Sequence, residues 1–182
     1  VRYPLVEASC GVLFAAVAAR FGASWELPAY LVLAAALLAV SLIDLEHFIV
    51  PDRITAPLTV SALALLGVAA LAEGNGWRFG RTLLGGVAYF AFLLLLNILY
   101  PKGMGMGDVK LAALLGVMLG RDVAVALMVG MLLAIVPSVV LLARHGSKAR
   151  KRGIPFAPFL AGGGIVGLFA GGQLLDAYLS LL

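Results

Sequence analysis

The chain has 182 residues, of which 63% are apolar and only 12% are Asp, Glu, Lys or Arg. Soluble domains are typically about 45–50% apolar and about 25% charged, so this composition, with a mean hydropathy of +1.10, excludes a water-soluble domain. A net charge of +4 could indicate a nucleic-acid partner in a soluble protein. Aromatic residues do not interleave with the basic ones here, and we therefore exclude nucleic-acid binding.

Apolar runs that approach or reach the roughly 20 residues needed to cross a bilayer predict an all-α integral membrane protein, a polytopic bundle of about six to seven transmembrane helices. In chain order we expect helices at about 5–21, 27–45, 53–72, 77–100, 108–119, 123–143 and 157–180. Proline and glycine separate several of these runs, and the fifth helix is short. No domain boundary or internal repeat is visible, so residues 1–182 are expected to form a single membrane domain.

Two acidic clusters interrupt this apolar chain. Residues 103–111 read GMGMGDVKL and place Asp108 behind three glycines at the start of the fifth helix. Residues 44–52 read DLEHFIVPD and begin with Asp44 at the end of the second helix. An ionisable residue beside a membrane segment is costly, so each cluster is a candidate functional site.

The loop charges predict that both clusters lie on the same side of the membrane. If the basic segment 144–152 is cytoplasmic and seven helices alternate, nine Lys and Arg residues are cytoplasmic and four are not, as the positive-inside rule requires. The nine are Arg2, Arg53, Lys102, Lys110, Arg144, Lys148, Arg150, Lys151 and Arg152, and the four are Arg20, Arg78, Arg81 and Arg121. The same alternation brings Asp44 and Asp108 to the cytoplasmic side.

Paired carboxylates can hydrolyse an amide bond without a covalent intermediate. Two carboxylates in one site resist simultaneous ionisation, so one holds a proton near neutral pH. The ionised member takes a proton from water and the protonated member polarises the carbonyl. Because a helix N-terminus stabilises an anion and a C-terminus does not, the helix ends assign Asp108 as the base and Asp44 as the acid.

The neighbouring residues are candidates for accessory roles. Gly103, Gly105 and Gly107 would allow an extended substrate to approach the loop closely, or they form an ordinary interhelical turn. Lys110 would either pair with a carboxylate or extend to the membrane interface.

Glu46 and Asp52 are the acidic neighbours of Asp44, and one of them is expected to be a solvated or helix-capping residue. A metal site is not expected, because His47 lacks a third committed ligand nearby. The single cysteine, Cys10, is read as a buried apolar residue, and no cofactor is expected.

These segments resemble those of type IV prepilin peptidases, membrane aspartic proteases of the GxGD type. Residues 105–108 match the GxGD signature, and residues 44–52 match the first motif, an Asp followed after several residues by Pro-Asp. Residues 154–160 (IPFAPFL) are similar to a later family segment in which Ala157 is usually Gly. Residues 2–7 (RYPLVE) resemble the start of the peptidase portion, so the resemblance covers nearly the whole chain.

The resemblance implies that Asp44 and Asp108 are catalytic and that Asp52 is accessory. It implies removal of a positively charged leader, after a Gly, from type IV prepilins or pseudopilins at the cytoplasmic face of the bacterial inner membrane. The implied partners are these substrates and the lipid bilayer. Many family members also carry paired CxxC motifs linked to N-methylation, which are absent here. The chain is therefore read as a truncated form or a peptidase-only branch, without methyltransferase activity in these residues.

Three other functions are compatible with parts of the sequence. A related GxGD protease with a preflagellin-type or presenilin-like substrate would use the same pair, although the Pro-Asp ending of residues 44–52 favours the prepilin branch. A proton or cation transporter could also use paired carboxylates, although transporters often show repeated halves. A purely structural role in a secretion complex would leave the costly acids unexplained.

Overall fold

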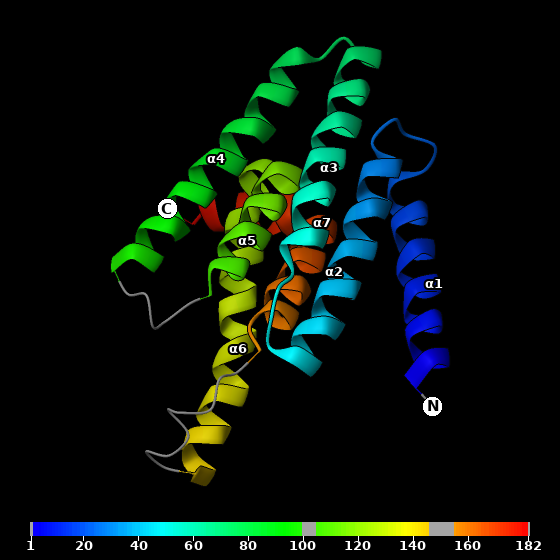
Figure 1. Ribbon diagram of the computed structural model, residues 1–182. Coiled ribbons are helices and arrows are strands. Elements are labelled where there is room, and N and C mark those ends of the chain that lie inside the picture. The colour runs from blue at the N-terminus through cyan, green and yellow to red at the C-terminus, as the bar shows by residue number, and fades with distance from the viewer. Residues whose placement is uncertain (1, 100–104, 146–154, 182) are drawn as a thin grey trace.

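The computed structural model describes residues 2–99, 105–145 and 155–181, and these residues form helices with no strand (Figure 1). The predicted all-α fold is confirmed, and each described helix begins and ends within three residues of its predicted limits. The elements are α1 (Arg2–Phe21), α2 (Leu27–His47), α3 (Asp52–Ala72), α4 (Gly76–Leu99), α5 (Met106–Leu119), the 3-10 turn η1 (Gly120–Asp122), α6 (Val123–His145) and α7 (Ala157–Leu179).

The described helices are long and apolar enough to form a multi-pass membrane protein. Six stretches meet the length and hydropathy expected of a membrane span, and one of them, residues 106–141, contains α5, η1 and most of α6. With 14 residues, α5 is only about 21 Å long, shorter than the roughly 30 Å hydrocarbon core. Whether α5 is counted as a separate span accounts for the predicted range of six to seven.

Side-chain contacts show that α7 runs antiparallel to α2. Ala157, the first residue of α7, meets Asp44 near the end of α2. Gly164, two turns further along α7, packs against Leu37, two turns before Asp44. The end of the bundle where α2 ends and where α5 and α7 begin is called the Asp44 end below.

The chain reverses direction at η1, between α5 and α6. Gly171, late in α7, lies against Asp122 of η1, whereas Gly163, earlier in α7, lies against Gly130 of α6. Gly120 begins η1 with φ of +57°, a left-handed conformation that glycine adopts without steric cost. The end of the bundle that contains η1 is called the Arg121 end below.

Helix α5 lies at the centre of the bundle, in contact with α2, α3, α4, α6 and α7. Most of its residues from Val109 to Met118 are buried. In Figure 1, α1 lies at one edge beside α2, and α4 lies at the opposite edge against α5. The predicted short helix is thus an internal helix, covered by its neighbours.

Two helix pairs approach each other closely through glycine. A Cβ atom added to Gly116 of α5 would lie 2.9 Å from the Cα of Gly86 in α4. A Cβ atom added to Gly163 of α7 would lie 2.6 Å from the backbone nitrogen of Gly130 in α6. Small residues at such crossings let backbones pack in direct contact, the usual way in which membrane helices associate.

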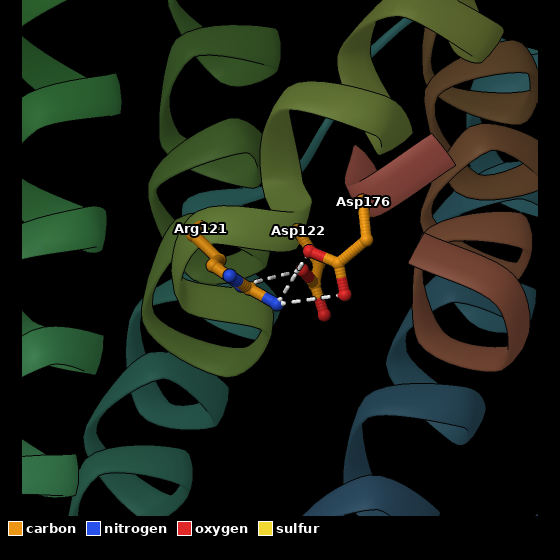
Figure 2. A network of polar contacts seen from close by, with 3 residues as sticks. All are labelled: Arg121, Asp122 and Asp176. Carbon is orange, nitrogen blue, oxygen red and sulfur yellow. Dashed lines mark hydrogen bonds and ion pairs between the residues drawn. The ribbon is translucent and has the colours of Figure 1, made fainter. Parts of the chain in front are cut away.

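Ion pairs connect η1 to the last turns of α7 at the Arg121 end. Figure 2 shows the Arg121 side chain reaching toward two carboxylates. Its Nη2 lies 3.1 Å from Asp176 Oδ1, and its Nε lies 3.5 Å from Asp122 Oδ1. The negative charges at this end are therefore matched by a cation.

Candidate active site

Asp44 lies in the last turn of α2 and is only 5% exposed. The helix ends three residues later at His47, and the next residue, Phe48, has a φ of 55°, the one positive value among the described residues other than glycine. The Phe48 N–H donates to the Asp44 carbonyl oxygen at 2.9 Å and closes the helix. This left-handed cap turns the chain away at once, so that Asp44 stays inside the bundle.

The Asp44 side chain accepts a hydrogen bond from the first turn of α7. The Ala157 N–H donates to Asp44 Oδ2 at 3.0 Å, and Ala157 is fully buried. The first N–H groups of a helix have no partner within it, and they carry a partial positive charge. Asp44 thus satisfies one of these donors, and the N-terminus of α7 stabilises negative charge on Asp44.

Asp108 lies half-buried in the first turn of α5. The Gly105 N–H donates to Asp108 Oδ2 at 3.3 Å, so the side chain caps the helix that carries it. Asp44 lies near enough for its charge to interact with that of Asp108. The structure therefore brings together Asp44, the first residue of the 44–52 motif, and Asp108, the last residue of the GxGD signature.

Neither of these two carboxylates pairs with a cationic side chain within the described part of the chain. Each instead takes its hydrogen bond from a backbone N–H at a helix N-terminus, Asp108 from its own helix and Asp44 from α7. The ends of the helices that carry them favour Asp108 as the base and Asp44 as the acid, but the N-terminus of α7 also faces Asp44. Once α7 is included, helix polarity no longer distinguishes the two.

Two of the three glycines of residues 103–107 are described, and Gly103 lies outside the described residues. Gly105 is exposed and precedes α5 in an extended conformation. Gly107 packs against the chain between α2 and α3, since a Cβ atom added to it would lie 2.6 Å from the Cβ of Val50. The close approach of Val50 therefore explains why position 107 is glycine, independently of any contact with a substrate.

Lys110 pairs with a carboxylate, one of its two predicted alternatives. Its Nζ lies 2.6 Å from Asp52 Oδ2, and the two side chains are 39% and 62% exposed. Asp52 begins α3, but Pro51 is the capping residue and no side-chain hydrogen bond caps this helix. Glu46 lies exposed in the last turn of α2.

The surface beside the two carboxylates is apolar. The side chains of Leu45, Phe48, Ile49 and Met106 are each about half exposed at the Asp44 end. Such a patch beside a polar site suits contact with an apolar segment or with lipid. Among the described residues, no group of three or more His, Cys, Asp and Glu side chains is placed to hold a metal ion.

Sequence reasoning missed one hydrogen-bond partner of Asp44, the backbone N–H of Ala157. Residues 154–160 matched a family segment, but nothing in their order indicated that the N–H of Ala157 would meet Asp44. The spacing of the two residues, 113 positions apart, carries no such information. The local signal of a helix N-terminus here is proline, with Pro155 just before the helix and Pro158 in its first turn.

The fold and this pair of carboxylates define a polytopic helical membrane protein with an acidic site at one end of the bundle. The model of the type IV leader peptidase family matches residues 31–143. The chain therefore belongs to the type IV leader peptidase family.

Curated relatives agree with this membership. The prepilin leader peptidase/N-methyltransferase of Stutzerimonas stutzeri is 36% identical, over 98% of this chain and 62% of that protein. Proteins of the same name from Pseudomonas aeruginosa and Bacillus subtilis are 33% and 32% identical over 98% of this chain, which covers 61% and 70% of them. The chain thus spans about three-fifths of the length of the first two relatives. No solved structure gives a significant match.

Proposed function

We propose that this chain is a single-domain membrane aspartic endopeptidase that removes the positively charged leader from type IV prepilins or pseudopilins. One observation carries the proposal. Asp44 and Asp108, the acids of the two motifs, interact at one end of the bundle without a cationic partner among the described residues. The family membership supports a peptidase, and the names of the relatives supply the substrate class.

Hydrolysis would need only water and the two carboxyl groups. The ionised carboxylate takes a proton from water while the water oxygen attacks the scissile carbonyl carbon, and the protonated carboxyl donates to the carbonyl oxygen. Collapse of the tetrahedral intermediate breaks the C–N bond, and the amine leaves with a proton from the carboxyl that received one. The N-termini of α5 and α7 stabilise the negative charge that remains on the pair.

The substrate fits the surroundings of the pair. Exposed Glu46 carries negative charge that suits a basic leader, and the apolar patch of Leu45, Phe48 and Ile49 suits the hydrophobic segment of a pilin. The excess of Lys and Arg that the sequence predicts on the side of the two motifs supports a cytoplasmic location of the site in a bacterial inner membrane. The N-methyltransferase activity in the relatives' names is not proposed for these residues, since the chain has one cysteine and no CxxC pair.

The test is cleavage of a purified prepilin by the chain in detergent, with the products identified by mass spectrometry. Wild type should release a leader at a Gly boundary, and Asp44→Asn and Asp108→Asn should not. Asp176→Asn, an aspartate of the opposite end, is the matched control and should cut normally. Cleavage by both active-site variants would overturn the catalytic pair. An inactive wild type that carries protons or cations into vesicles would favour the transporter.

A further inference from the structure

The segment between α2 and α3 lies across the first turn of α5. It begins at Phe48, directly after the turn that carries Asp44, and ends at Pro51, directly before α3. Val50 in this segment approaches Gly107 so closely that an added Cβ atom would lie 3.1 Å from the Val50 carbonyl oxygen. The chain that follows one active-site aspartate therefore touches the residue that precedes the other.

A second contact lies beside the first. Lys110 Nζ lies 2.6 Å from Asp52 Oδ2 and joins positions 58 residues apart. Residues three apart on a helix lie on the same face, so Gly107 and Lys110 present one face of α5 to this segment. Asp108 lies between them on a neighbouring face, and neither contact involves its carboxylate.

We propose that the Asp52–Lys110 ion pair, together with the packing of Val50 on Gly107, is a clamp that sets the position of Asp108 relative to Asp44. This inference rests on the proposed function. α2 and α5 make little direct contact, far less than α4 makes with α5. Helix α7 contacts both helices along the bundle, whereas the clamp joins the end of α2 directly to the start of α5.

Lys110 and Asp52 are positioning residues in this arrangement, because they act through the backbone of α5. A misplacement of about 1 Å can cost about 100-fold in rate, so loss of the pair should reduce kcat about 10-fold and leave KM within about two-fold. Direct binding of a basic leader by Asp52 would instead raise KM.

Charge exchange tests the clamp. Asp52→Lys and Lys110→Asp should each lower kcat, and the double variant that carries both should return to within about three-fold of wild type. Asp176→Asn, which breaks the exposed ion pair of the opposite end, should leave kcat unchanged. A double variant no more active than the weaker single variant, or a loss confined to KM, would overturn the proposal.

Hydrogen exchange tests the same clamp without using proteolysis. Asp52→Asn should speed exchange of the backbone amides at 107–111, and it should leave the amides at 115–119 unchanged. Equal exchange in wild type and variant would overturn the clamp even if cleavage were lost. If wild type failed to cut any prepilin, the proposed function would fail, and the exchange experiment would still decide whether the ion pair holds this turn.

Discussion

Each end of the bundle has an exposed ion pair, Lys110–Asp52 at one and Arg121–Asp176 at the other, but the remaining aspartates are held differently. At the Arg121 end, Asp122 and Asp176 share the guanidinium of Arg121 (Figure 2). At the Asp44 end, Asp44 and Asp108 interact with each other and have backbone N–H groups as hydrogen-bond donors. A cation neutralises a carboxylate, whereas a backbone donor orients it and leaves its charge and proton available. We therefore expect the Arg121 end to hold the helices together and the carboxylates of the Asp44 end to take part in the proposed chemistry.

The largest effect should come from removing a carboxylate at each end in turn. Asp44→Asn or Asp108→Asn should lower prepilin cleavage at least about 100-fold, since general acid–base catalysis contributes about 10²–10⁴-fold. Asp176→Asn should remain within about two-fold of wild type. Steady-state rates in detergent measure this difference. Similar losses at both ends would remove the functional distinction between them.

A smaller loss of activity should follow from disturbing the donor to Asp44. Ala157 is fully buried, so Ala157→Val overpacks its site, a change that costs about 1–3 kcal/mol, and displaces its N–H from the carboxylate. We expect cleavage to fall about 10-fold. Ala157→Gly keeps the N–H and adds no volume, and its cleavage rate should match wild type. If the valine variant cut normally, this hydrogen bond would not contribute to catalysis.

The substitution Asp108→Asn should raise the stability of the folded protein although it lowers the cleavage rate. Asp108→Asn removes the electrostatic penalty of placing a second carboxylate beside Asp44, and active sites commonly hold such destabilising arrangements at a cost to stability. We expect a higher thermal unfolding midpoint in detergent than for wild type. A lower midpoint would mean that the capping of α5 by Asp108 stabilises the fold more than the repulsion with Asp44 destabilises it.

The smallest effect should be at the Arg121 end. Arg121→Gln leaves Asp122 and Asp176 without their cation. The Arg121–Asp176 pair is exposed on both sides, whereas the Asp122 side chain is 29% exposed, and exposed ion pairs contribute about 0–1 kcal/mol. We expect the unfolding midpoint to fall slightly and the cleavage rate to stay unchanged. Loss of cleavage with an unchanged midpoint would show that this end also takes part in catalysis.

Helix positions were predictable because their signals are local. Apolar runs, prolines and glycines gave all seven helices to within three residues, and the alternation of helices placed Asp44 and Asp108 at one end before any contact was known. The roles of Asp44 and Asp108 as acid and base were not predictable in this way, because the helix N-terminus that faces Asp44 is not local to it. The local sequence shows only the end of α2, which carries Asp44. The N-terminus of α7, which donates to Asp44, lies 113 residues further along the chain.

The sequence by itself determined the membrane class, the helices, the two motifs and their common end of the bundle. Only the tertiary structure decided that Ala157 donates to Asp44, that Lys110 pairs with Asp52 and that Val50 covers Gly107. Hydropathy and turn residues act over a few neighbouring positions, whereas these contacts depend on which helix faces pack together. That packing is set by small residues at distant crossings, such as Gly116 on Gly86, and no local pattern reports it.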